Sequence, residues 1–125
     1  MTAYRKTEVE SFSAGSDLTT SQFRFVKLQS NGRVIRCDTA GERAYGVVLN
    51  KPANGETAQV AIGEGGSEVV AGGAVTRGVE VTTDNQGRAV AATTDKYYVN
   101  GIARTAASAA GNRFGVNLTT YQKNV

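Results

Sequence analysis

Side chains able to do acid–base, nucleophilic or metal chemistry are few, because this chain of 125 residues contains no histidine and one cysteine. Without an imidazole, neither a Ser-His-Asp nor a Cys-His site can form, and a single thiolate cannot build a zinc site. The one cysteine, Cys37, ends a Val-Ile-Arg-Cys run typical of a strand, in which Arg36 points to the opposite face. We therefore expect Cys37 to pack in the core and not to act as a nucleophile.

Carboxylates and glycine-containing loops offer no stronger candidate. Glu64, Glu68 and Glu80 could supply the acid pair of a glycoside hydrolase, but nothing in the sequence brings them together, and aromatic residues to line a cleft make up only 7% of the chain. The loops 63–66 and 84–87 lack, respectively, the spacing of a phosphate loop and the bidentate acid of a calcium loop. The sequence predicts no enzyme, no catalytic residue, no metal site and no cofactor.

The elements that would position any site are short strands, and one pair of them occurs twice. Each copy consists of a strand that begins with glycine, a turn that contains glycine and a second strand: 46–49, 54–55 and 58–62 in the first copy, 101–103, 110–111 and 115–118 in the second. This order is typical of a β-hairpin. The sequence therefore indicates a protein built from two similar halves.

Other apolar runs are also short and are separated by turn residues, and none has a sustained helical period. They predict strands at 23–28, 34–37, 45–49, 58–62, 68–71, 79–82, 88–92, 97–103 and 114–118, with single helical turns at 18–21 and 105–110. In the first run, Phe23 and Phe25 share one face while Val26 and Leu28 share the other, which indicates burial on both faces or a bulge. We predict an all-β fold, a small antiparallel β-sandwich or barrel with an extended N-terminal arm.

We assign residues 1–16 to the arm and residues 17–125 to a single β-domain. The arm is mostly polar, and such a segment is either frayed or ordered by a partner. Its apolar residues Tyr4, Val9 and Phe12 favour docking, with Arg5 and Lys6 as charged contacts. These five residues are the predicted interface with a partner or with a neighbouring subunit.

The amino-acid composition favours binding to other proteins, including further copies of this chain. Large apolar side chains are few and glycines number 15, so a thin core favours an oligomer in which subunits complete each other's burial. The net charge is only +3, and no apolar stretch approaches the ~18 residues of a membrane span, so we expect no membrane partner. The arginines either are solvated or pair with acidic patches on a protein partner: Arg24, Arg33, Arg36, Arg43, Arg77, Arg88, Arg104 and Arg113.

An oligonucleotide-binding β-barrel is the main alternative, because it fits the size, the strand content and the pI of about 9.2. It needs aromatic side chains for base stacking beside a basic groove. Phe23, Phe25, Tyr97 and Tyr98 could supply them, although the two phenylalanines have the pattern of core residues.

Several runs resemble the head-decoration proteins of bacteriophages, also called capsid cement proteins, in the same order over about residues 17–118. They are DLTTSQFRFVKL (17–28), YGVVLNKPANGE (45–56), EVVAGGAV (68–75), DNQGRAVA (84–91), GIAR (101–104) and AASAAG (106–111). One departure is Val79, which separates Gly78 from Glu80 where the family usually places an acid directly after the glycine.

The resemblance implies a non-enzymatic structural protein, made in the host cytoplasm and located in the virion on the outer surface of the assembled head. It implies the major capsid protein as partner and a homo-oligomer, with a trimer preferred over a dimer, and no direct contact with nucleic acid. We expect multivalent clamping between capsid subunits, with the arm adding a strand to a neighbouring edge. A tail or fibre component is a second alternative. The sequence leaves open the oligomer size and the capsid position.

Overall fold

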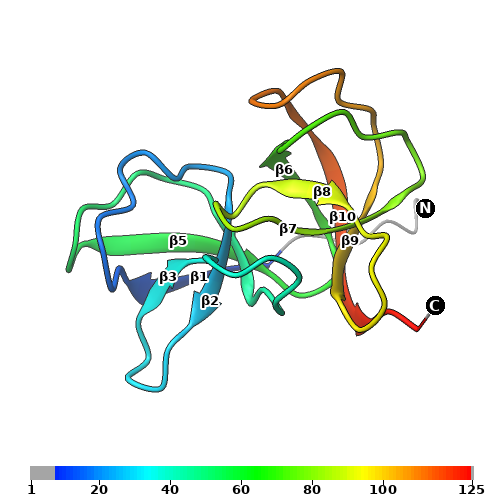
Figure 1. Ribbon diagram of the computed structural model, residues 1–125. Helices are drawn as coiled ribbons and strands as arrows, with labels where there is room; N and C mark the ends of the chain where they lie inside the picture. Colours follow the sequence, from blue (N-terminus) through cyan, green and yellow to red (C-terminus); the bar gives the residue numbers. More distant parts are fainter. Residues whose placement is uncertain (1–7, 125) are drawn as a thin grey trace, which may run out of the picture.

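The computed structural model describes residues 8–124, which form two antiparallel five-stranded sheets (Figure 1). The strands are β1 (Glu8–Ser13), β2 (Phe25–Leu28), β3 (Val34–Arg36), β4 (Gly46–Val48), β5 (Thr57–Ile62), β6 (Gly66–Val70), β7 (Glu80–Thr83), β8 (Ala89–Ala91), β9 (Tyr98–Ala103) and β10 (Arg113–Gln122). No helix occurs in this part of the chain, so the all-β prediction is confirmed. The predicted helical turn at 105–110 is wrong, because this segment is a loop in which Ala107 bridges to Val75.

The two sheets have the same topology. Their strand orders are β1-β5-β4-β2-β3 and β6-β10-β9-β7-β8, so the first five strands correspond one to one with the last five. Each sheet curls so that the two residues just after β1 or β6 meet the start of β3 or β8. The Gly15 N–H donates to the Val34 C=O at 2.7 Å, and the Gly72 N–H donates to the Ala89 C=O at 2.8 Å. The prediction of two similar halves is confirmed, and we call residues 8–62 lobe 1 and residues 66–122 lobe 2.

The glycine that begins each repeated hairpin is required by the close approach of the paired strands. A Cβ on Gly46 would lie 2.2 Å from the Ala61 carbonyl oxygen of β5. A Cβ on Gly101 would lie 2.3 Å from Cγ1 of Val116 on β10. Real Cβ atoms do not approach so closely, so only glycine fits at these two equivalent positions.

Buried side chains form two clusters, one inside lobe 1 and one that spans both lobes. The first contains Ala14, Leu18, Val26, Val34, Val48, Ala58 and Val60, with Phe12 and Ile62 packed against it. The second joins Phe25, Val47 and Ala61 of lobe 1 to residues of lobe 2 such as Val81 and Leu118. Phe25 and Val26, which are adjacent, are 1% and 0% exposed. The predicted burial of this strand on both faces is therefore confirmed.

The predicted start of that strand at Phe23 is wrong, because the strand begins at Phe25. Phe23 has a φ of 62°, in the left-handed region, and the equivalent residue of lobe 2 is Gly78, with a φ of 89°. The Phe23 C=O accepts from the Val70 N–H at 2.8 Å, and its ring lies 4.9 Å below the Arg113 guanidinium carbon. This backbone conformation thus joins lobe 1 to lobe 2.

A second left-handed position gives a prediction about stability. Lys96 has a φ of 72°, and the equivalent residue of lobe 1, Gly41, has a φ of 80°. Because a Cβ is disfavoured there, we expect Lys96→Gly to raise the free energy of unfolding by roughly 0.5 to 1 kcal/mol. The reverse change, Gly41→Ala, should destabilise, since its Cβ would lie 2.4 Å from the Tyr97 ring. Urea denaturation measures both, and a lower midpoint for Lys96→Gly would refute the assignment.

Candidate docking surface

The outer edge of β1 is an unpaired sheet edge. β1 pairs with β5 on one side only, and among residues 8–124 no strand covers its other side. Ser11 lies opposite Gln59, whose C=O accepts from the Leu49 N–H at 2.8 Å and so faces β4. The backbone groups of Ser11 therefore point away from β5, and alternation along the strand gives Val9 and Ser13 the same direction. This edge offers unpaired N–H and C=O groups to an incoming strand.

Two of the five predicted interface residues lie on this strand. Val9 is 52% exposed at the edge. Phe12 is half-buried against the core of lobe 1, and its ring meets the Tyr45 ring edge-on, with centroids 5.5 Å apart and an interplanar angle of 89°. Tyr4, Arg5 and Lys6 lie outside the described residues. The second part of the predicted arm is thus part of the first sheet.

An apolar surface, missing from the predicted site, lies at one end of lobe 1. It consists of Phe12, Leu28, Tyr45 and Ile62, which we call the open end. Leu28 and Tyr45 are each 41% exposed, although both belong to predicted strands. Most large apolar side chains of a small soluble domain are buried, so two such neighbours at the surface suggest an interaction site.

The equivalent end of lobe 2 is covered by lobe 1. The strand registers align the four residues of the open end with Val69, Thr83, Asn100 and Leu118, each between 0% and 6% exposed. The segment before β4 covers them. Its Gly41 N–H donates to the Thr83 C=O at 2.9 Å, and its Ala44 N–H donates to Asn100 Oδ1 at 3.0 Å. The same end of the fold is therefore an interface in lobe 2 and is exposed in lobe 1.

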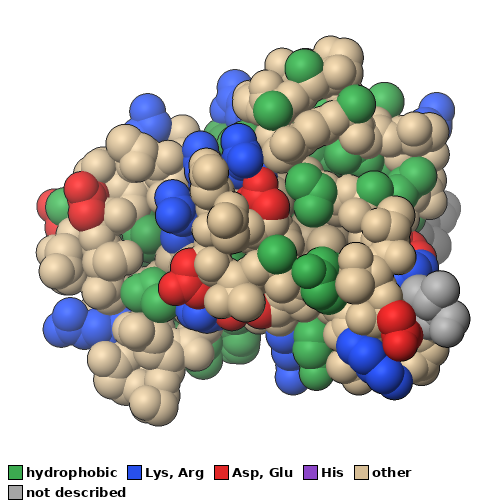
Figure 2. Space-filling model, in the orientation of Figure 1, with side chains coloured by type: hydrophobic (Ala, Val, Ile, Leu, Met, Phe, Trp, Pro, Cys, Tyr) green, Lys and Arg blue, Asp and Glu red, His purple; other side chains and the backbone are tan. Residues whose placement is uncertain are grey.

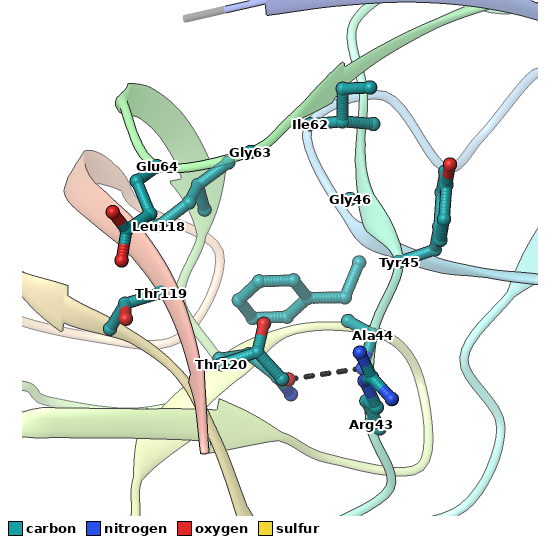
Figure 3. Close-up of a pocket in the computed structure, with 12 residues that line it drawn as sticks. Arg43, Ala44, Tyr45, Gly46, Ile62, Gly63, Glu64, Leu118, Thr119 and Thr120 are labelled. Atoms are coloured by element: carbon teal, nitrogen blue, oxygen red, sulfur yellow. Dashed lines mark hydrogen bonds between the residues drawn. The ribbon is translucent and has the colours of Figure 1, made fainter. Parts of the chain in front are cut away.

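Tyr45 stands between two hollows. The first, of about 340 Å³, lies between the lobes (Figure 3). Leu118, Thr119 and Thr120 of β10 form one wall, the segment 43–46 forms the opposite wall, and the segment 62–64 closes one end. The second hollow, of about 400 Å³, separates Tyr45 from Leu28. An exposed aromatic ring between two hollows is the shape that anchors a protein–protein contact.

The three acids considered for catalysis are not brought together as a pair. Glu68, on β6, faces Arg113 at 3.6 Å, whereas Glu80, on β7, accepts hydrogen bonds from the side chains of Lys123 and Tyr121. Lys123, and then Tyr121, lower the pKa of the Glu80 carboxyl, and Glu80 raises the pKa of Tyr121 to about 12. Glu80 thus holds Tyr121 and Lys123 against β7. The third acid, Glu64, lines the hollow between the lobes.

Among residues 8–124, no group of three His, Cys, Asp or Glu side chains lies close enough to hold a metal ion. Within the same residues, no helix is long and apolar enough to cross a membrane.

Cys37 is fully buried in the cluster that spans both lobes, which confirms the packing prediction. Burial raises the pKa of its thiol to about 12, so almost no thiolate forms at neutral pH. We expect Cys37 to resist dithiobis(nitrobenzoate) in the native protein and to react fully in urea. Rapid stoichiometric labelling of the native protein would contradict this burial.

The aromatic residues proposed for base stacking do not form one platform. Phe25 is 1% exposed, and the Phe23 ring is covered by Arg113. Tyr97 lies against Gly41, where lobe 1 meets lobe 2. Three of the four rings are therefore buried or in contact with other parts of the fold, which weakens the nucleic-acid alternative.

Comparisons with known proteins agree with this architecture. A family model described as phage cement protein matches residues 11–118. Similar solved structures include the crystal structure of the head fiber gp8.5 N base in bacteriophage phi29, with a TM-score of 0.71 and 20% sequence identity over 91% of this chain and 95% of that chain. At this identity the likeness concerns the fold. Comparison with curated proteins gave no match.

Proposed function

Because the chain belongs to the phage cement protein family, it is a structural protein of the phage virion, and we propose that it decorates the outer surface of the assembled head. In this role it binds the major capsid protein as a homo-oligomer, with a trimer preferred, and bridges neighbouring capsid subunits. Contacts that are weak one at a time then add through effective concentration, which stabilises the shell. No catalytic residue is needed.

The observation that carries this proposal is the difference between equivalent ends of the two lobes. In lobe 2 the end is sealed by hydrogen bonds from the segment before β4. In lobe 1 it leaves Leu28 and Tyr45 exposed beside two hollows. In lobe 2 this end contacts lobe 1, whereas in lobe 1 the equivalent end is free to contact another protein. We assign the capsid subunit as that protein.

The arm of residues 1–16 supplies the second contact. The free edge of β1 adds to a strand of a capsid protein or a neighbouring subunit, in the manner of β-augmentation. In this arrangement Tyr4, Val9 and Phe12 are the apolar anchors, and Arg5 and Lys6 are the charged contacts. In this arrangement the β-domain, residues 17–125, binds the capsid surface and so places the arm beside the strand that it joins.

Ser11→Pro tests the edge contact. The Ser11 N–H points away from β5, so proline removes a group that only an incoming strand would use. We expect a urea midpoint close to that of the wild type and about tenfold weaker binding to undecorated heads in a pelleting assay. The control Glu10→Pro removes an N–H that faces β5 and should destabilise the fold. Unchanged head binding by a folded Ser11→Pro variant would remove β1 from the interface.

A fibre base is the second candidate, since a protein of the same fold is described as the base of a head fiber. It would also bind the head but would carry a further virion protein. Virions from which fibres are sheared separate the two roles: decoration predicts that this chain stays on the head at high copy number, whereas a fibre base predicts few copies, each with a fibre.

A further inference from the structure

Three arginines from separate segments meet where the lobes join. Arg24 precedes β2, Arg36 ends β3, and Arg88 follows the turn between β7 and β8. A Cβ on Gly87, in that turn, would lie 2.7 Å from Cγ of Arg36 and 3.3 Å from Cβ of Arg24. The Arg24 guanidinium donates to the Gln86 C=O at 3.0 Å. We call these three residues the arginine cluster, and Figure 2 shows Lys and Arg side chains gathered near the junction of the lobes.

The charge of the cluster is only partly balanced. Asp84 Oδ2 lies 2.8 Å from Nε of Arg88, while Oδ1 accepts the backbone N–H groups of Gln86 and Arg88. Among residues 8–124, no other carboxylate forms an ion pair with the cluster, although Asp17 and Asp38 line a hollow together with Arg36. Burial, and then the charges of Arg36 and Arg88, lower the pKa of Arg24. An arriving anion would relieve this repulsion.

The fold itself does not require arginine at these positions. By the repeat, Arg24 and Arg36 correspond to Val79 and Ala91 of lobe 2, where the same backbone hydrogen bonds form without charged side chains. Only Arg88 has an arginine, Arg33, as its counterpart. Lobe 1 thus carries two charges that the equivalent surface of lobe 2 lacks, which points to a use outside the fold.

We propose that the arginine cluster binds carboxylates of an acidic segment on the capsid protein. This assignment rests on the proposed function and names the chemistry of its partner. Guanidinium groups bind carboxylates through paired hydrogen bonds, and three of them around one turn match two or three neighbouring acids. Nucleic acid fits less well, because the two rings next to Arg24 cannot stack a base: Phe25 is buried, and Phe23 is covered by Arg113.

The test measures binding of a fluorescent hexaglutamate peptide to the whole chain. We expect the wild type to bind and Arg24→Gln/Arg36→Gln to bind about tenfold more weakly, with a smaller dependence on salt. The control Arg77→Gln/Arg104→Gln removes the same charge from exposed positions in lobe 2 and should bind like the wild type. Arg24→Lys/Arg36→Lys, which keeps the charge, should recover part of the affinity and confirms that loss is not misfolding.

Equal binding by the wild type and Arg24→Gln/Arg36→Gln would overturn the assignment. So would tighter binding of a single-stranded oligothymidylate of the same charge than of the peptide, because the partner would then be a nucleic acid. The peptide assay needs no heads, so the two proposals fail separately. A chain that binds the peptide but not the heads refutes decoration alone, and a chain that binds the heads without the cluster refutes this inference alone.

Discussion

Gly46→Ala should destabilise the protein by about 3 kcal/mol or more. The new Cβ would lie 2.2 Å from the Ala61 carbonyl oxygen, which is backbone and cannot rotate away. Relief requires β4 to separate from β5, which weakens their ladder and exposes Val47 and Val48, both fully buried. Urea denaturation followed by circular dichroism measures the loss.

Two glycines serve as controls for this substitution. Gly73→Ala introduces a Cβ with nothing within 4 Å and should stay within about 0.5 kcal/mol of the wild type. Gly101→Ala should cost less than Gly46→Ala, because the backbone oxygen that its Cβ would meet, that of Asn117, lies 2.9 Å away, whereas that of Ala61 lies 2.2 Å from the Cβ at position 46. Equal stabilities for Gly46→Ala and Gly73→Ala would show that the strands do not approach as described.

The second large effect is expected at the open end. Leu28→Gln/Tyr45→Gln should weaken binding to undecorated heads by about 30-fold or more, since an aromatic anchor at the centre of an interface typically contributes about 2 kcal/mol. The loss of the Phe12–Tyr45 ring contact should lower stability by only about 1 kcal/mol. A pelleting assay at several protein concentrations gives the affinity.

Tyr121→Gln is the matched control, because Tyr121 is also 41% exposed but lies on β10 of lobe 2. It matches the Tyr45→Gln half of the double variant, because it removes one equally exposed tyrosine ring away from the open end. If the double variant and Tyr121→Gln bind heads equally well, the open end is not the docking surface.

Much of the fold could be predicted from residue types and their spacing in the sequence. The repeated glycines at 46 and 101 predicted the paired hairpins, because close strand approach leaves a direct signature in residue type. The switch of apolar face between Phe25 and Val26 predicted burial on both faces or a bulge, and the structure has the first of these. The burial of Cys37 could likewise be predicted, because this residue ends the strand-like run Val-Ile-Arg-Cys.

Features that depend on backbone contacts between distant segments left no such signature. β1 is held to β5 by its ladder while five of its six side chains are exposed, so its sequence is typical of a polar arm. Phe23 adopts a left-handed conformation that its side chain disfavours, because contacts with lobe 2 hold it there.

The candidate site was harder still to predict. Tyr45 and Leu28 have the pattern of buried strand residues, and their exposure follows only from which end of which lobe is covered. The two copies carried a partial signal, since Asn100 and Thr83 stand where lobe 1 has Tyr45 and Leu28. The arginine cluster needed the tertiary structure, because its members are 12 and 52 positions apart along the chain (36 − 24 and 88 − 36).

The most direct test of the central proposal is to pellet heads assembled without this protein after mixing them with the purified chain. Decoration predicts binding that saturates at a fixed number of copies per head, in multiples of the oligomer measured by light scattering. A chain that remains in the supernatant at every concentration, although folded, would contradict the proposal that it decorates the head.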